Sequence, residues 1–435
     1  MSGIAGPVER VVVVGAGIAG LAAASALREA GIECVVLEAR DRIGGRLHTV
    51  DLAGTPIDLG GSWIHHPIGN PLTDFCDEHG VGYDPGDPMP SLSGYDRAEA
   101  RRLDHDEIDT YSKESDEFWD SIEAMAERLG PDANADNAIE VHIADRGLTG
   151  AAARRTRQEL RAEIEADAPG KVSDQSLTWL AMDEEFQGSL FGNLPRGGYR
   201  SVVEALAGDT DIRLNVEAVA VAVEADGVLV TCGDGTVEAG SHVVVTVPLG
   251  VLKRGRPRFE PPLPVAVEHA IDKLAFGRYE KIALRFETPF WRDEGLSHLV
   301  VFPRDENEPS MWVFDLDAFG AGPVLCAHLF HTLTPYALDQ SSAAAVNWFK
   351  EVLAEVFGHP VPEPIATVVT GWANDPMAGG SYSHCPRGAD PSMYDALAEQ
   401  LHGRILLAGE HTQAARVGYA DGAYVSGLRA ARRLV

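Results

Sequence analysis

The first feature of the chain with clear chemical meaning is a set of glycines followed by a single acidic residue. Gly15, Gly17 and Gly20 have the spacing G-x-G-x-x-G, and Glu38 follows them. This spacing is typical of a dinucleotide site, because Gly15 permits a tight turn, Gly17 lets the backbone approach a pyrophosphate, and Gly20 lets a helix pack close to a sheet. The acid would accept hydrogen bonds from ribose hydroxyls. We therefore predict a dinucleotide site near the start of the chain.

The residues around these glycines predict the elements that position them. Residues 11–14 are all valine, as a buried parallel strand requires. Apolar residues then repeat at helical spacing from Leu21 to Leu27, and Gly31 ends the helix. Residues 34–37 predict the next strand. This order favours a dinucleotide site over an ordinary glycine-rich turn, and it places the start of the helix against the phosphate charge.

Binding sites for FAD and for NAD both contain this arrangement, and residues 40–46 indicate which of the two cofactors is bound. They read Arg-Asp-Arg-Ile-Gly-Gly-Arg and resemble the second flavin-binding signature of glutathione-reductase-like flavoproteins, most closely the flavin amine oxidases. The resemblance implies FAD, with Gly44 and Gly45 against the pyrophosphate and Arg46 helping to hold the cofactor, supported by Arg42. Further contacts implied beside the glycine turn and the acid are Ile18, Ala19, Ala39 and Arg40.

The length of 435 residues exceeds one ordinary domain, so we expect two. The resemblance implies an α/β protein with a discontinuous, Rossmann-type, glutathione-reductase-like FAD-binding domain and a mixed α+β substrate-binding domain. We assign residues 1–80, 195–262 and 375–435 to the first domain and residues 81–194 and 263–374 to the second. Residues 111–130 predict a helix with one apolar stripe, and residues 151–166 predict a charged, mostly exposed helix.

A second segment that resembles the flavin amine oxidases contains two adjacent histidines. Residues 57–66 read Ile-Asp-Leu-Gly-Gly-Ser-Trp-Ile-His-His and precede Gly-Asn-Pro-Leu at 69–72, a form closer to polyamine than to monoamine oxidases. The resemblance places the segment along the flavin ring and makes His65 an active-site residue, but gives no role to His66. A hydrogen-bonded structural histidine is the alternative. The implied cofactor contacts are Leu59, Gly60, Gly61, Ser62 and Trp63.

A third such segment, residues 274–286, contains Lys281 within an apolar strand pattern. In the family, a lysine in this frame holds a water that touches flavin N5. Burial that deprotonates or pairs the amine would suit Lys281 to this role. The alternative is a surface lysine whose aliphatic stem packs on apolar neighbours.

The fourth and fifth segments, residues 371–383 and 405–423, contain Tyr382 and Tyr419. The resemblance implies that these tyrosines are facing walls of an aromatic cage, which would orient and desolvate an amine. Ser381 stands where mitochondrial monoamine oxidases have the cysteine that bonds to flavin, so we predict non-covalent FAD. The other contacts implied are Trp372, Gly409, Glu410 near the pyrophosphate, Ala420 at a helix start facing the flavin pyrimidine, and Ala218 beside the adenine.

The reaction implied by the resemblance is oxidation of an amine, and a polyamine or diamine is favoured by the Trp-Ile-His form and the acidic chain. The carbon beside the nitrogen would deliver a hydride to flavin N5, water would hydrolyse the imine to an aldehyde and an amine, and dioxygen would become hydrogen peroxide. Glu184 and Glu185 are either near a second ammonium or part of a solvated turn. Two alternatives stay open: an L-amino-acid oxidase, which needs an arginine aimed at the substrate carboxylate, and a flavin-binding partner protein without turnover.

The composition argues against several kinds of partner. A net charge of -30 disfavours nucleic acid. No apolar run approaches ~18 residues, and neither a secretory signal nor a terminal membrane tail is recognisable, so we expect a cytoplasmic protein with no membrane partner. The cysteines, scattered without C-x-x-C spacing, predict reduced thiols and no metal site. The expected partners are a small-molecule amine and dioxygen, and the oligomeric state stays open.

Overall fold

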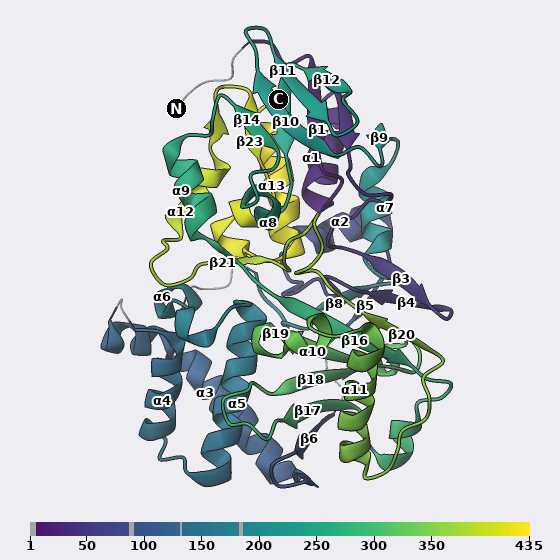
Figure 1. Ribbon diagram of the computed structural model, residues 1–435, viewed down its shortest axis with the longest axis vertical. Helices are drawn as coiled ribbons and strands as arrows, with labels where there is room; N and C mark the ends of the chain where they lie inside the picture. Colours follow the sequence, from purple (N-terminus) through teal and green to yellow (C-terminus); the bar gives the residue numbers. More distant parts are fainter. Residues whose placement is uncertain (1–5, 87–90, 131–132, 182–185) are drawn as a thin grey trace.

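The computed structural model of the protein describes residues 6–86, 91–130, 133–181 and 186–435. A mostly parallel sheet with its helices fills the upper part of Figure 1, and an antiparallel sheet flanked by helices fills the lower part. The chain passes between these two parts several times, because strands from distant stretches of sequence lie in the same sheet. The two sheets give the molecule the two-part α/β organisation that the sequence predicts.

The upper part is built on a six-stranded sheet of order β22-β23-β13-β1-β2-β9. Its strands are β1 (Arg10–Val14), β2 (Glu33–Leu37), β9 (Ile212–Arg213), β13 (His242–Val245), β22 (Gln400–Leu401) and β23 (Ile405–Leu407). In the central strand β1, Val13 pairs in parallel register with Val36 on one side and Val244 on the other. The carboxyl ends of the parallel strands therefore share one edge, where open α/β sheets bind their ligands.

The faces of this sheet are covered by different structures. Helices α1 (Ile18–Glu29) and α13 (Ala420–Arg432) share one apolar core with β1. The other face packs on a four-stranded sheet of order β12-β11-β10-β14. Its strands are β10 (Ala218–Val223), β11 (Val228–Cys232), β12 (Val237–Gly240) and β14 (Arg258–Glu260). Together these elements are the predicted Rossmann-type domain.

Helix α9 (Val265–Lys273) corrects one predicted domain boundary. Its buried residues Val267 and Ala270 belong to the same core as Leu397 of α12 (Ser392–Ala398) and the valines of β13. The boundary predicted at residue 263 is therefore too early for this helix, because its apolar face packs on the FAD-binding side of the molecule. Charged residues on its outer face hide that affiliation in the sequence.

The lower part is a seven-stranded sheet of order β20-β16-β19-β18-β17-β6-β7. Its strands are β6 (Leu92–Asp96), β7 (Arg101–Arg102), β16 (Tyr279–Arg285), β17 (His298–Phe302), β18 (Met311–Asp315), β19 (Val324–Phe330) and β20 (Ala366–Val369). Ile282 and Leu284 pack with helix α11 (Ser342–Phe357) on one face. Because side chains alternate along a strand, Lys281 belongs to the opposite face.

Three helices stand beside this sheet, at the lower left of Figure 1: α3 (His105–Leu129), α4 (Ala135–Asp145) and α5 (Gly150–Asp167). The predicted apolar stripe of α3 is buried at Phe118, Ile122 and Met125. The prediction that α5 is mostly exposed is wrong. Its charged residues Arg155, Glu159 and Glu165 are buried against partners distant in sequence; Arg155, for example, pairs with Asp96.

Shorter elements connect these layers. They are β3 (Thr49–Leu52), β4 (Thr55–Asp58), α2 (Pro71–His79), β5 (Tyr83–Pro85), α6 (Leu177–Leu180), β8 (Asn193–Pro195), α7 (Arg200–Ala207), α8 (Leu249–Leu252), β15 (Ala275–Phe276), α10 (Pro335–Leu338) and β21 (Ser383–His384). Among the described residues, none of the helices combines the length and the apolar character that crossing a bilayer requires. The cysteines are free thiols, and no cluster of metal-ligating side chains occurs in the described part of the chain.

Candidate active site

A cavity of about 920 Å³ runs between the two parts of the molecule. It starts at the carboxyl ends of β1 and β2, passes the loop after β4, and continues between α3, α5 and the antiparallel sheet. Every residue that the sequence analysis assigns to the site lines this cavity except Gly20. Arg42, which the resemblance made a supporting contact to the cofactor, also lies outside the cavity lining.

The second and third glycines of the first motif, Gly17 and Gly20, have different roles. Gly17 is the N-cap of α1, no side chain caps the helix, and a Cβ at Gly17 would meet nothing within 4 Å. The first amides of α1 are therefore available to an anion in the cavity. A Cβ at Gly20 would lie 1.9 Å from the carbonyl oxygen of Gly15. Gly20 is thus the packing residue that the motif predicts, and its further inclusion among the cofactor contacts is corrected, because it does not line the cavity.

The acid and the second glycine pair complete this end of the cavity. The Glu38 carboxylate is buried and accepts hydrogen bonds of 2.8 Å from the backbone amides of Ala16 and Arg40. A carboxylate can accept more than two hydrogen bonds, so it retains capacity for ribose hydroxyls. Gly44 and Gly45 have φ values of 93° and 60°, which favour glycine. These residues form a surface of backbone atoms suited to a pyrophosphate.

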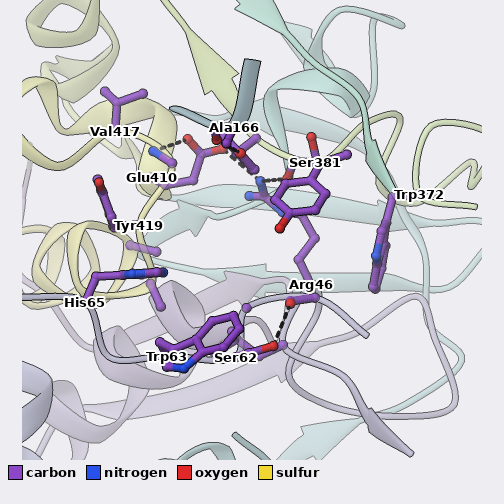
Figure 2. Close-up of a pocket in the computed structure, with 18 of the residues that line it drawn as sticks. Arg46, Ser62, Trp63, His65, Ala166, Trp372, Ser381, Glu410, Val417 and Tyr419 are labelled. Atoms are coloured by element: carbon purple, nitrogen blue, oxygen red, sulfur yellow. Dashed lines mark hydrogen bonds and ion pairs between the residues drawn. The ribbon is translucent and has the colours of Figure 1, made fainter. Parts of the chain in front are cut away.

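An ion pair joins the two ends of the chain across the cavity wall. Arg46 Nη1 lies 2.9 Å from Glu410 Oε1 and also donates to the Ser381 carbonyl oxygen at 2.7 Å (Figure 2). Glu410 Oε2 accepts from Ser383 Oγ at 2.6 Å and from the Gly418 amide at 3.1 Å. Burial raises the pKa of Glu410, but the charge of Arg46 and the Ser383 hydrogen bond outweigh burial and leave the pKa below its ordinary value.

A second uncapped helix start borders the cavity. Helix α13 begins at Ala420, its N-cap is Tyr419, and no side chain satisfies its first amides. Ala420 and Ala423, one turn further along, both line the cavity. The positive end of this helix would stabilise negative charge that gathers on a bound group. The cavity therefore has one uncapped helix start near the predicted pyrophosphate and another near the predicted flavin ring.

Lys281 is buried, so the surface-lysine alternative is wrong. Its Nζ donates to the carbonyl oxygens of Asp58 at 3.1 Å and Gly60 at 2.7 Å, and to Ser62 Oγ at 2.8 Å. Burial lowers the pKa of this amine. The contacts use all three donors of a charged amine, so the predicted water would have to share or replace one of them.

The predicted cage tyrosines are fixed by different neighbours. Tyr382 Oη donates to the carbonyl oxygen of Ala166 at the end of α5. The guanidinium of Arg416 lies 3.8 Å from the ring centroid of Tyr419, so only the opposite face of this ring is open to a ligand. Both tyrosines line the cavity, and the charge of Tyr419 contributes to raising the pKa of Tyr382, after the larger effect of burial. Their facing arrangement as a cage stays a prediction.

His65 lies beside Tyr419, with its ring centroid 5.3 Å from that of the tyrosine (Figure 2). Its Nδ1 donates to the carbonyl oxygen of Leu190, which leaves Nε2 as the acceptor. Burial lowers the pKa of His65 to about 4. The imidazole is therefore neutral near pH 7, and it can accept a hydrogen bond but is a weak base.

Two tryptophans complete the walls. Trp372 lies on the side of the pocket opposite Tyr419 in Figure 2, and its Nε1 donates to the Leu59 carbonyl oxygen at 3.0 Å. Trp63 packs against Phe191 and Phe314, with ring centroids 5.5 and 5.2 Å away. Trp63 Nε1 and Ser381 Oγ are buried without a hydrogen-bond partner. These two unpaired donors, the open space at Gly17 and the acid at Glu38 all fit a bound FAD.

Sequence reasoning missed several residues of the cavity lining. In the antiparallel sheet, Lys281 pairs with His328, and His328 pairs with Trp312. All three line the cavity as one row across the strands, so the strand register is the signal that sequence alone lacked. Glu159 and Glu163 of α5 also line the cavity and were expected at the surface. Glu184 and Glu185, singled out in the sequence, lie outside the described residues.

The comparisons with known proteins agree with this geometry. The sequence model for flavin containing amine oxidoreductases matches residues 18–435. Polyamine oxidase 4 of Oryza sativa subsp. japonica is 30% identical over 97% of this chain and 87% of its own length. Lysine-specific histone demethylase 1 homolog 3 of Oryza sativa subsp. indica is 32% identical over 98% of this chain, which spans only 54% of that relative.

A solved structure gives the same result at the level of the fold. A variant of putrescine oxidase superposes with a TM-score of 0.78 at 22% identity, covering 98% of this chain and 99% of that one. This likeness confirms the predicted fold class. The matched family and the fitted cavity together confirm FAD as the cofactor. The chain belongs to the family of flavin-containing amine oxidoreductases.

Proposed function

We propose that this protein oxidises a diamine or polyamine to an aldehyde and a shorter amine, with dioxygen reduced to hydrogen peroxide. The observation that carries the proposal is that one cavity contains both the dinucleotide-binding residues and a buried, mainly aromatic chamber beyond them. A relative named polyamine oxidase, 30% identical over nearly the whole chain, supports the substrate class. The oxidation of amines itself follows from the family.

Bound FAD supplies the two-electron acceptor that takes a hydride from the carbon beside the amine nitrogen. The chain's own residues bind and orient the substrate. Tyr382 and Tyr419 offer ring faces with negative quadrupole density, which attract an amine and exclude water. His65 Nε2, held in the acceptor form by the Leu190 carbonyl, can accept a hydrogen bond from the amine N–H. We expect His65 to act through orientation, because a pKa of about 4 makes it too weak a base to deprotonate an ammonium.

Lys281 fixes the wall that runs along the flavin ring. Its amine holds Asp58, Gly60 and Ser62 together, and these residues belong to the loop predicted to lie on the ring. A positively charged or strongly polarised amine at this place would stabilise electron density that arrives on the cofactor side of the cavity. Lys281 thus combines a positioning role with an electrostatic one in this proposal.

We propose further that FAD is bound without a covalent link. Ser381 is the residue at the position where a thioether would need a cysteine, and its buried hydroxyl lines the cavity. Acid precipitation of the holoenzyme should therefore leave all yellow chromophore in the supernatant. Flavin that stays with the precipitated polypeptide would contradict non-covalent binding.

An L-amino-acid oxidase is disfavoured by the charges around the cavity. Such an enzyme needs a cation for the substrate carboxylate. The arginines in the described lining each form an ion pair: Arg40 with Asp375, Arg46 with Glu410, and Arg256 with Glu217. The relatives named histone demethylases make an N-methylated lysine peptide the second substrate to test.

A panel of amines tests the proposal. Purified holoenzyme in air is given putrescine, spermidine, a monoamine, leucine and an N-methyl-lysine peptide, and peroxide release is measured. We expect peroxide with putrescine or spermidine at higher kcat/KM than with the other compounds. A preference for leucine or the peptide would contradict the proposed substrate class. No peroxide with any compound would favour a flavin-binding protein without turnover.

A further inference from the structure

A stripe of α5 extends from the predicted aromatic cage into the far part of the cavity. Glu159, Glu163 and Ala166 are spaced so that they share one face of the helix, and all three line the cavity. Ala166 lies at the reaction end, because its carbonyl accepts the hydrogen bond from Tyr382. A rise of 1.5 Å per residue puts Glu163 ~5 Å and Glu159 ~10 Å along the helix from Ala166. Two carboxylates thus stand at a defined range from the cage.

Both carboxylates are enclosed with neutral hydrogen-bond donors only. Glu159 accepts from Ser310 Oγ at 2.5 Å and from Trp312 Nε1 at 3.1 Å. Glu163 accepts from Ser115 Oγ at 2.5 Å and from Trp119 Nε1 at 2.7 Å. Neither carboxylate makes an ion pair with the part of the chain that the structure describes. Glu159 is buried and Glu163 is half-buried at the cavity wall. Buried carboxylates are normally paired with a cation, so this pair lacks a partner that the cavity could supply.

The electrostatics of the pair point to a cationic ligand. Burial, and then the neighbouring charge of Glu163, raise the pKa of Glu159 to about 8, and burial raises the pKa of Glu163 as well. Asp116 of α3 adds to the negative potential at Glu163. Two like charges this close cannot both ionise in an empty, desolvated site. A cation bound between them would remove this conflict and let both carboxylates ionise.

An independent feature marks the same place as a binding site. Tyr111 of α3 is 4% exposed and lines the cavity, and its hydroxyl makes no hydrogen bond. Tyr111 lies one helical turn from Ser115, which donates to Glu163. The charges of Glu159 and Glu163 help to raise the pKa of Tyr111 after the larger effect of burial. A buried hydroxyl without a partner calls for a polar group from a ligand. An ammonium has three donors, enough for the two carboxylates and this hydroxyl.

The walls around the pair select an organic cation over a metal ion. No group of three or more metal-ligating side chains occurs among the described residues. Trp119, Trp312 and Phe191 line this part of the cavity and offer aromatic faces to methylene groups and to positive charge. We infer that Glu159 and Glu163 bind the distal ammonium of the substrate and thereby select diamines and polyamines over monoamines. This inference rests on the proposed function.

Paired carboxamide variants test the inference on the holoenzyme. A single substitution removes the repulsion and leaves the other carboxylate free to ionise, so the decisive variant is E159Q/E163Q. The matched control is E165Q on the same helix, because Glu165 is a buried carboxylate that hydrogen-bonds Thr332 outside the cavity lining. The measurement is kcat/KM for 1,4-diaminobutane and for butylamine, which have the same carbon chain and differ in the distal ammonium.

We expect kcat/KM of E159Q/E163Q for the diamine to fall roughly 10- to 100-fold, mostly through KM, as the loss of a charged hydrogen bond implies. Its kcat/KM for butylamine should stay within about threefold of wild type, and E165Q should keep the wild-type ratio of the two substrates. If E159Q/E163Q does not fold, the E163Q and E159Q single variants should each lower the diamine-to-monoamine ratio by a smaller factor than expected of the double variant, because one carboxylate remains to bind the ammonium.

The outcomes separate this inference from the proposed function. Wild-type enzyme that oxidises both substrates equally well, or a double variant that keeps the wild-type preference for the diamine, overturns the role of the two glutamates while leaving amine oxidation intact. Wild-type enzyme that oxidises neither of these amines nor spermidine overturns the proposed function, and the inference fails with it.

Discussion

Alanine substitutions at the second and third glycines of the first motif, Gly17 and Gly20, should separate an effect on cofactor binding from an effect on stability. At Gly17 the backbone has φ −73° and ψ 174°, which alanine adopts without strain, and an added methyl enters the cavity. At the N-cap such a change costs at most about 1 kcal/mol of folding free energy. At Gly20 the added Cβ would lie 1.9 Å from a backbone oxygen. Overpacking of this severity costs about 3 kcal/mol, less about 1 kcal/mol from the better helix propensity of alanine, which leaves about 2 kcal/mol.

The cofactor affinities should change in the other order. In Gly17→Ala the methyl stands between the start of α1 and the pyrophosphate, so FAD affinity should fall roughly 10- to 100-fold, the value of one charged hydrogen bond. Urea unfolding of the deflavinated proteins measures stability, and fluorescence titration with FAD measures affinity. Gly17→Ala with wild-type FAD affinity, or Gly20→Ala with wild-type stability, would refute the separation of a binding glycine from a packing glycine.

Three further changes probe the cavity walls. Glu410→Gln should lower the free energy of unfolding at pH 7 by about 1.5–3 kcal/mol by weakening the hydrogen bond from Arg46. Because the folded pKa of Glu410 lies below its ordinary value, urea unfolding at several pH values should show the difference in unfolding free energy between wild type and variant above about pH 4.5, and this difference should shrink below that pH. A difference that does not change with pH would contradict the pairing. His65→Ala should lower kcat/KM without altering the dependence of kcat/KM on pH between about 6 and 8, the range in which a histidine of ordinary pKa titrates. The reason is that His65 is already neutral there. A titration that disappears in the variant would argue for a charged His65. Lys281→Met should retain FAD but lower kcat roughly 100-fold. Steady-state assays measure kcat, and the visible absorbance measures the flavin content of the variant. An unchanged kcat would show that Lys281 has no role in turnover.

The dinucleotide end of the molecule could be predicted because its signals are local. The valines of β1, the glycine turn and the start of α1 are consecutive in sequence, and their local preferences agree with one another. Glu38 follows at the end of the next strand, so its place in the cavity also follows from local order. The packing role predicted for Gly20 follows from the same local order, and the structure confirms it, although Gly20 lies outside the cavity lining.

The far part of the cavity could not be predicted because its contacts are distant in sequence. Glu159 and Glu163 have the spacing of an exposed charged helix, and only the tertiary fold brings Ser310 and Trp312 of the antiparallel sheet against Glu159. The burial of α5 depends in the same way on partners such as Asp96. Charged residues on a helix face predict that the face is exposed to solvent only when no other element packs against it. Here a carboxylate stripe faces the cavity.

The most direct test of amine oxidation in this cavity is the visible spectrum of the holoenzyme under anaerobic conditions. We expect 1,4-diaminobutane to bleach the yellow absorbance completely and air to restore it, because the proposed reaction transfers a hydride from the substrate carbon to the flavin. A spectrum that stays unchanged with every diamine and polyamine would contradict the central claim that this cavity brings an amine against the flavin.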